Sequence, residues 1–222
     1  MDSVDPSAVL ASAGLAAATR GRASVRRYLP DPVPRDDVRA MVELAVHAAN
    51  AGNAQMWRFV AVEDELTQVA MRQAVDDAVD VMAGWPEVAA AVTEKQVKAF
   101  RVYSTFFAEA PLTIAVFGLP YESVADTMLA AHGVGLEEHD RLRQRPDLQS
   151  IGGAVQVLCT AAHALGYGTC WMTAPVLAAE AIERLLGVEP PARLVALVPV
   201  GRPAGEVRPS SRRPVEDVLE FR

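Results

Sequence analysis

Residues 21–28 read GRASVRRY, a segment that places three arginines and one serine between two stretches with helical patterns. Arginine presents a planar fork of donors that matches phosphate oxygens, and a serine hydroxyl adds a short hydrogen bond. The segment therefore predicts a phosphate-binding loop. The alternative interpretation is a solvated turn that follows the N-terminal helix.

The composition limits the kind of protein to which this loop can belong. The chain has 222 residues, of which 51% are hydrophobic and 22% are charged, so one domain over residues 1–222 is sufficient. The net charge of -7 argues against a nucleic-acid binder and against a protein of anionic membranes, because both need a broad cationic surface. Residues 1–5 are acidic and no apolar run approaches the ~20 residues of a membrane span. We expect a cytoplasmic protein.

The two cysteines, Cys159 and Cys170, lie eleven positions apart. They form no CxxC motif, and no histidine stands at a metal-ligand spacing from them. We therefore expect reduced thiols in the core and no metal site.

Periodicity predicts alternating helices and strands along the chain. Alternating or continuous apolar runs predict strands at 57–62, 112–117 and 193–200. In the first half of the chain, helical patterns cover 8–19, the segment from Pro34 to Ala49, and two parts of 66–107 that are separated by a break near 84–86. In the second half they cover 151–165 and a stretch that ends near 186, and a short final helix is expected from Pro214.

Residues 50–55 form a polar loop of sequence NAGNAQ. Asparagine and glutamine amides both donate and accept, which suits a heteroaromatic edge that carries carbonyl and N–H groups. A helix C-cap followed by a turn explains the same residues, because Gly and Asn favour left-handed backbone.

Two further features leave alternatives open. Phe100, Tyr103 and Phe107 share a helical face, which most simply indicates core packing. The charged segment 121–149 is a solvated helix or a lid, and it carries His132 and His139. Either histidine could act as a general acid, although the pattern favours ordinary surface histidines.

The C-terminal half contains two more polar sites. Residues 168–175 (GTCWMTAP) predict a short strand that ends in small residues and leaves backbone N–H groups free. Residues 208–217 (RPSSRRPVED) form a second basic cluster. Two separate arginine sites in an acidic protein are hard to explain as a contribution to solubility.

Five motifs in order resemble the nitroreductase family of FMN flavoproteins, and together they cover nearly the whole chain. They are RASVRRY at 22–28, NAQMWRF at 53–59, ALGYGTCWM at 164–172, VPVGRP at 198–203 and RRPVED at 212–217. The resemblance implies an α+β, three-layer fold with a central mixed β-sheet flanked by helices. It also implies an intertwined homodimer with two FMN molecules at its interface, a possible lid at 121–149 and a C-terminal arm at 205–222.

The resemblance further implies which residues bind FMN. Arg22, Ser24 and Arg212 would hold the phosphate and ribityl end, although Arg213 remains an alternative to Arg212. Arg26 would lie against the N1/C2-carbonyl edge, where reduction places negative charge.

The remaining contacts implied by the family lie around the ring. Asn50, Asn53 and Gln55 would reach the flavin of the other subunit. The backbone N–H of Thr173 would point at N5, with Trp171 and Met172 packed nearby. Because the cofactor carries the chemistry, no side chain is expected to be catalytic in its own right.

Several positions depart from the family pattern. The family often has Pro-Ser where Ala49 and Asn50 stand, Pro where Met56 stands, a polar or basic residue where Ala23 stands, and Gly where Ala174 stands. These differences affect the expected shape of the pocket on the substrate side. The Glu, Tyr and Lys set of the deiodinase branch is not evident between residues 94 and 149.

The expected function is that of an FMN-dependent NAD(P)H oxidoreductase. It would reduce nitroaromatic, quinone or related electron-poor acceptors by ping-pong hydride transfer through flavin N5. One alternative is a flavin-dependent dehalogenase or a metabolite-specific oxidoreductase of the same fold. Another is a flavin-binding protein without turnover.

Overall fold

The computed structural model describes residues 14–222. The first described helix is α2 (Leu15–Gly21), so the earlier part of the helix expected at 8–19 lies outside the described residues, as does the acidic start of the chain. The helix ends where the arginine loop begins. No helix in the described part of the chain is long and apolar enough to cross a membrane.

The centre of the fold is a four-stranded sheet in the order β1-β2-β4-β3. Every neighbouring pair of these strands is antiparallel, and a single parallel bridge joins Ser24 to Thr169 among the isolated bridges. The three longer strands expected from the sequence are confirmed, and so is the short strand expected within 168–175. The bounds are β1 (Trp57–Val62), β2 (Leu112–Gly118), β3 (Gly168–Thr169) and β4 (Arg193–Gly201).

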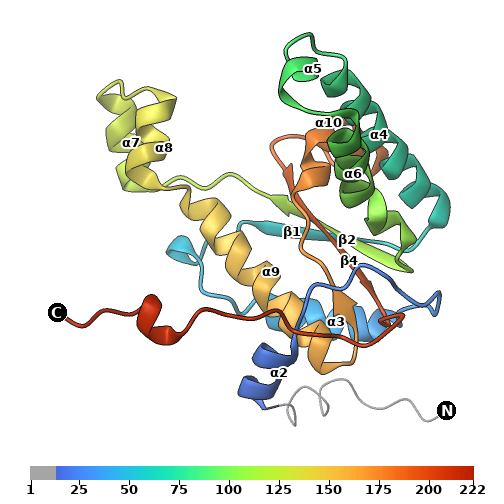
Figure 1. The fold of residues 1–222 in the computed structure, drawn as a ribbon. Coiled ribbons are helices and arrows are strands. Elements are labelled where there is room, and N and C mark those ends of the chain that lie inside the picture. The colour runs from blue at the N-terminus through green and yellow to red at the C-terminus, as the bar shows by residue number, and fades with distance from the viewer. Residues whose placement is uncertain (1–13) are drawn as a thin grey trace.

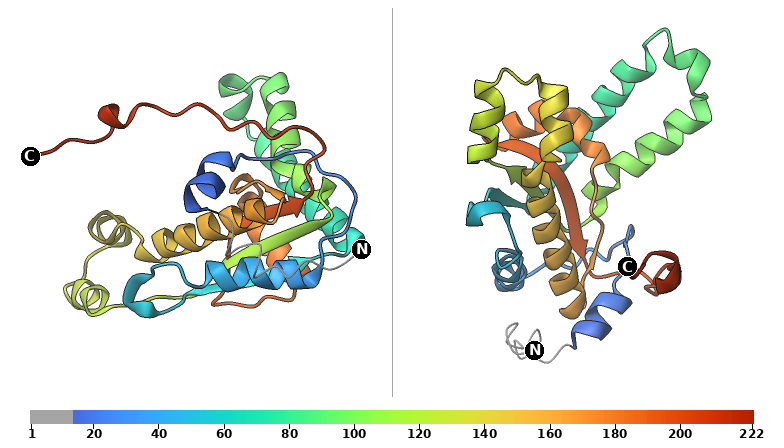
Figure 2. Two further views of the ribbon diagram at one scale, coloured as in Figure 1. Left: turned by 90° about the horizontal axis from the view of Figure 1, so that it is seen from below. Right: turned by 90° about the vertical axis from the view of Figure 1, so that its left-hand side faces the viewer.

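Two helices cover one face of the sheet, α3 (Arg35–Ala45) and α9 (Pro146–Ala164), as Figures 1 and 2 show. Pro34 precedes α3 as expected, and Pro146 occupies the first turn of α9, which therefore begins five residues earlier than predicted. The core of this layer includes Met41, Ile114, Val116, Val155, Leu158 and Val198.

The opposite face is covered by α4 (Glu65–Ala83), the short turn η2 (Phe106–Glu109) and α10 (Ala179–Leu185). Successive side chains of a strand point to opposite faces, so β2 supplies Ala115 and Phe117 to this second core. Its other members include Met71, Val75, Phe107, Ile182 and Leu197. The expected three-layer α+β architecture is confirmed. The sheet that was expected to be mixed is antiparallel in its four strands, and among the described residues only the Ser24–Thr169 bridge is parallel.

The helix α6 (Glu94–Thr105) returns from the far end of α4 through α5 (Val88–Ala91). Phe107 is fully buried, but Phe100 and Tyr103 are 38% and 47% exposed. The expectation that all three aromatic residues lie in the core is therefore wrong. The chain reaches the sheet only where α6 gives way to η2, so the earlier turns of α6 keep these two rings at the surface.

Two segments stand away from this body in Figure 1. The first is a helical hairpin of α7 (Val124–Ala131) and α8 (Leu136–Arg143). The second is the C-terminal segment, which is exposed from residue 208 onward and contains the expected short helix η4 (Val215–Asp217). Figure 2 shows this segment passing α9 and continuing beyond the body of the subunit.

A buried carboxylate joins α10 to the start of β4. Glu183 is 4% exposed, and its Oε1 accepts a hydrogen bond from the backbone N–H of Leu194 at 2.7 Å. Its Oε2 pairs at 3.2 Å with Arg193, whose side chain is mostly in solvent. The bond to the backbone is therefore the contact that matters for stability, because an exposed partner adds little.

We expect Glu183→Ala to lower the free energy of unfolding by about 1–3 kcal/mol, because the buried Leu194 N–H loses its acceptor. Glu183→Gln keeps a carbonyl oxygen at the same place and should cost less than about 1 kcal/mol. Chemical denaturation of both variants measures the difference. Equal losses would show that the charge, and not the backbone contact, is the stabilising feature.

Candidate functional site

The arginine loop is attached by backbone hydrogen bonds to the edge of the sheet formed by β3 and β4. The N–H of Val25 donates to the carbonyl of Thr169 at 2.9 Å, and the N–H of Leu29 donates to the carbonyl of Arg202 at 2.8 Å. Tyr28 also forms an antiparallel bridge with Pro203. The loop is thus held at both ends by strands that are remote from it in sequence.

Alternate side chains of the arginine loop point toward the sheet and toward solvent. An added Cβ at Gly168 would lie 2.5 Å from the side chain of Val25, so a glycine is required where Val25 packs on β3. Ser24 and Arg26 are exposed. The packing of Val25 therefore directs its two neighbours out of the protein, where a ligand can reach them.

Ser24 and Arg26 line a pocket of about 300 Å³ between the loop and residues 203–208. Arg27 and Arg208 also line it, and Arg208 forms an ion pair with Glu206 at 2.7 Å. A hydroxyl beside several guanidinium groups is a donor set that fits a phosphate-bearing ligand. Sequence reasoning noted Arg208 within the basic cluster but gave it no role, because distance along the chain hides its position beside the loop.

The charge of Arg22 reaches the C-terminal end of α9. Burial lowers the pKa of His163 in the last turn of that helix, and the charge of Arg22 lowers it further. The pKa of the Cys159 thiol is raised by burial. Both cysteines are buried and unpaired, as expected.

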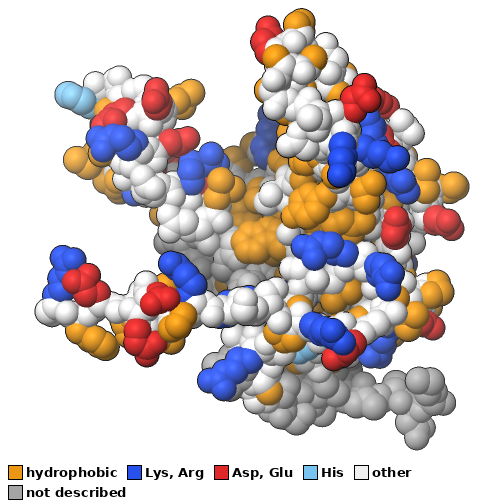
Figure 3. Space-filling model, viewed as in Figure 1, with side chains coloured by type: hydrophobic (Ala, Val, Ile, Leu, Met, Phe, Trp, Pro, Cys, Tyr) orange, Lys and Arg blue, Asp and Glu red, His pale blue; other side chains and the backbone are white. Residues whose placement is uncertain are grey.

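Arg26 lies over an aromatic side chain of α6. Its guanidinium carbon is 5.9 Å from the centroid of the Tyr103 ring, a cation–π geometry. Burial raises the pKa of the Cys170 thiol, while Arg26 and a hydrogen bond from Ser24 act in the opposite direction. Figure 3 shows hydrophobic side chains gathered on this face below α6, with Lys and Arg side chains beside them.

Residues 171–173 follow β3 toward the turn η3 (Ala174–Ala178). Met172 exchanges two backbone hydrogen bonds of 2.9 Å with Leu197, and its side chain is buried in the second core. Its backbone N–H therefore has a partner, contrary to the expectation for this stretch. Thr173 is exposed, and Trp171 is 40% exposed with its ring against Gly152 of α9.

The loop at 50–55 is closed by its own asparagine. The Oδ1 of Asn50 accepts from the N–H of Gln55 at 2.8 Å, and its Nδ2 donates to the carbonyl of Ala48 at 3.2 Å. Asn53 and Gln55 have positive φ and exposed side chains. Asn50 therefore shapes the loop, while the amides of Asn53 and Gln55 face outward.

The two predicted halves of the site lie at opposite ends of α9 within one chain. The N–H of Ala51 donates to Ser150 Oγ at 3.1 Å in the first turns of the helix, whereas Gly21, at the start of the arginine loop, packs against His163 in the last turn. Thirteen residues at 1.5 Å each separate these points by about 20 Å. One subunit does not bring Asn53 and Gln55 to the arginine loop.

Arg212 also lies outside the pocket. It is exposed on the C-terminal segment and donates to the backbone carbonyls of Ser210 and Ser211 at 2.9 and 3.0 Å. The basic residue of this segment that lines the pocket is Arg208.

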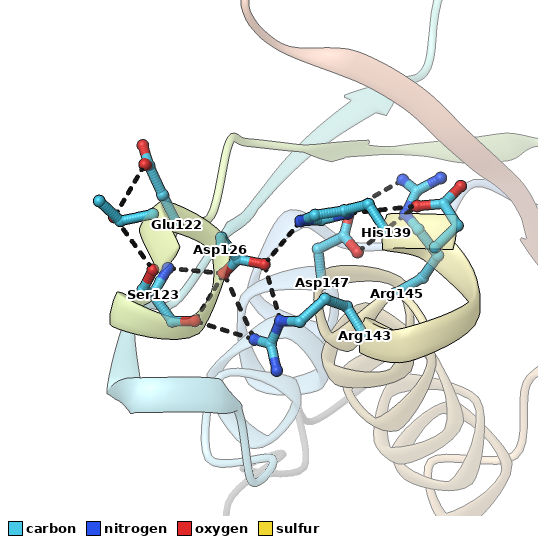
Figure 4. Close-up of polar contacts among 9 residues, drawn as sticks. Glu122, Ser123, Asp126, His139, Arg143, Arg145 and Asp147 are labelled. Carbon is cyan, nitrogen blue, oxygen red and sulfur yellow. Dashed lines mark hydrogen bonds and ion pairs between the residues drawn. The ribbon is translucent and has the colours of Figure 1, made fainter. Parts of the chain in front are cut away.

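The charged segment 121–149 contains a compact polar cluster, drawn in Figure 4. Asp126 accepts from Ser123 Oγ at 2.6 Å and from Arg143 Nε at 2.7 Å, and the Arg143 guanidinium holds the pKa of Asp126 well below its usual range. The Nε2 of His139 lies 3.0 Å from the same carboxylate. His139 thus joins α8 to α7, and His132 is exposed at the end of α7.

Comparisons with known proteins agree on one family. A family model described as the nitroreductase family matches residues 19–202. The chain is 29% identical over 216 residues to an NADH dehydrogenase of Thermus thermophilus, covering 90% of this chain and 92% of that protein. It is 30% identical over 193 residues to a 5,6-dimethylbenzimidazole synthase of Rhodospirillum rubrum, covering 87% and 83%.

A solved structure supports the same assignment. The BluB-like flavoprotein from Clostridium difficile superposes with a TM-score of 0.84 at 26% identity, covering 95% of this chain and 99% of that one. The family model, the two relatives and this structure each extend over most of the sheet and of its covering helices. This protein belongs to the nitroreductase family.

Proposed function

We propose that this protein passes electrons from NAD(P)H to nitroaromatic, quinone or related electron-poor acceptors. The donor leaves before the acceptor enters the same site, which is a ping-pong sequence. The cofactor of the family is FMN, and NAD(P)H supplies the electrons. Bound FMN supplies hydride transfer at ring atom N5. The observation that carries the proposal is the pocket in which Ser24 and Arg26 meet residues 203–208.

The residues of this chain supply binding and electrostatics. Arg22 and Ser24 would hold the phosphate end, where charge-assisted hydrogen bonds are strongest. Ser24 lines the pocket, whereas Arg22 is not among its lining residues. Arg26 would place a positive charge beside the part of the ring that becomes negative on reduction. The N–H of Thr173 and the ring of Trp171 would border the reacting face. The Met172 side chain is buried in the second core and holds residues 171–173 against it.

Anaerobic mixing of the FMN-loaded protein with NADH or NADPH tests the reaction. We expect the flavin absorbance to bleach with at least one donor and to recover when a nitroaromatic or quinone is added. A protein that retains FMN but bleaches with neither donor would contradict the proposed electron donor.

A metabolite-specific oxidoreductase or dehalogenase is the second candidate. The relative from Rhodospirillum rubrum supports it, as does the α7–α8 hairpin, which presents Val124, Met128 and Leu136 to solvent. We propose that segment 121–149 acts as a lid in that case. The nicotinamides would then reduce the cofactor poorly, and a specific ligand would change the flavin spectrum.

We also propose that two copies of the chain form an intertwined homodimer. A complete site needs Asn53 and Gln55 near the arginine loop, and one subunit holds them about 20 Å apart along α9. An antiparallel pairing of two α9 helices would place the 50–55 loop of one copy at the C-terminal end of the other helix. The arm at 205–222 extends beyond its own subunit (Figure 2) and carries exposed Val218 and Phe221. The cytoplasmic location stays a prediction.

The phosphate assignment predicts that Arg22→Ala weakens FMN binding about 10- to 100-fold, because a charge-assisted hydrogen bond is worth ~1.5–3 kcal/mol. Arg208→Ala and Arg212→Ala, measured in the same titration, decide which arm residue shares the phosphate. Arg20→Ala is the matched control, since Arg20 is exposed on the neighbouring helix α2. Full retention of FMN by Arg22→Ala through dialysis would overturn the assignment.

The dimer proposal predicts a particle of twice the 23.8 kDa chain mass by light scattering. Val218→Asp combined with Phe221→Asp should shift it toward the monomer, because burying a new carboxylate in an apolar contact is costly. Leu66→Asp places the same charge on another exposed apolar position, at the start of α4, and should leave the mass unchanged. A monomeric wild-type protein at micromolar concentration would contradict the proposal.

A further inference from the structure

The phenol of Tyr28 points back into the arginine loop. Its Oη donates to the carbonyl of Val25 at 2.6 Å. Burial raises the pKa of this phenol far above its ordinary value, so the group remains a donor throughout the physiological range. The carbonyl of Val25 and the N–H of Arg26 belong to one planar peptide unit. The hydrogen bond therefore fixes the plane from which Arg26 projects.

Tyr28 is itself fixed to the end of β4. Its backbone bridges Pro203, and the next N–H in the chain donates to the carbonyl of Arg202. An added Cβ at Gly201 would lie 3.2 Å from the Cβ of Tyr28, so the two residues are in close contact. Tyr28 therefore links the end of β4, a core strand, to a loop that faces solvent, so the strand fixes the position of the loop.

Arg26 depends on this support because its side chain has few contacts of its own. Within residues 14–222 its guanidinium makes no side-chain hydrogen bond, and its guanidinium carbon lies 5.9 Å from the centroid of the Tyr103 ring. A cation–π contact at an exposed site is worth ~0.5–1 kcal/mol and leaves the guanidinium considerable freedom. The backbone of residue 26 consequently decides where the charge lies.

We infer that Tyr28 is a positioning residue that sets the reduction potential of the bound cofactor through Arg26. The inference rests on the proposed function, in which Arg26 lies beside the flavin edge that gains negative charge. A guanidinium held in advance stabilises that charge without having to reorganise. Without the phenol hydroxyl, the 25–26 peptide can rotate and the charge moves away from the ring.

Tyr28→Phe tests this inference, because it removes one oxygen and keeps the ring in the core. We expect the oxidised cofactor to bind within about threefold of wild type. The reduced cofactor should lose about tenfold in relative affinity, which for two electrons is a fall of ~30 mV in midpoint potential. Redox titration of the purified, FMN-loaded variant measures the shift.

A double-mutant cycle separates positioning from a general structural effect. In an Arg26→Ala background, Tyr28→Phe should no longer change the potential, because the charge that it positions is absent. Tyr167→Phe is the matched control. The Tyr167 hydroxyl also donates a 2.6 Å bond, to Asp37 of α3, so its loss should lower thermal stability while the potential stays at the wild-type value.

Three results would overturn the inference. These are an unchanged potential in Tyr28→Phe, an equal shift in the Arg26→Ala background, or an equal shift in Tyr167→Phe. The proposed function is tested separately by the wild-type protein. If wild type binds FMN and bleaches with a nicotinamide while one of these results is obtained, the proposed function stands and the role of Tyr28 is wrong. If wild type binds no FMN, both are wrong.

Discussion

The backbone hydrogen bond from Val25 to Thr169 joins the two parts of the chain on which the candidate site depends. Thr169 belongs to a two-residue strand that follows the long helix α9, and it lies 144 positions from Val25. Strand β3 in turn pairs with β4, whose other edge pairs with β2. The arginine loop is therefore an extension of the sheet, and its position follows from the packing of the core.

This attachment explains why small residues are found around the loop. Gly168 allows Val25 to approach β3, and Gly201 is confined between Pro111 and Tyr28. Side chains at either glycine would push the loop away from the strands. A rigid scaffold that carries an exposed polar loop is a common arrangement for binding sites, because it limits the entropy lost when a ligand binds.

The strands, several helices and the family can be predicted from the sequence, because each of them has a strong local pattern. Strand β2 has a continuous apolar run because helices cover both of its faces. The sequence does not distinguish a solvated helix from a lid at the α7–α8 hairpin, because a hairpin with no buried residue has no apolar stripe. The exposure of Phe100 and Tyr103 was missed for a related reason, since spacing identifies a common face but not what covers it.

The sequence predicts which types of residue form the candidate site better than it predicts what each residue does there. The expected contact of Asn50 with the flavin of the other subunit stays a prediction, and the structure adds that its amide closes its own loop. Arg208 was overlooked because nothing local shows that residues 203–208 return to the arginine loop. Tyr28 was recognised as part of a motif, but its link to Val25 is visible only in three dimensions.

The division of the site along α9 has a consequence for how the protein behaves on dilution. In the proposed dimer, the cofactor contacts residues from two chains, so occupancy and assembly are coupled by mass action. Each bound cofactor would strengthen the association of subunits, and each dissociation event would open both cofactor sites at once. At low cellular concentrations of this protein, the fraction of active sites would then depend on subunit concentration as well as on the supply of FMN.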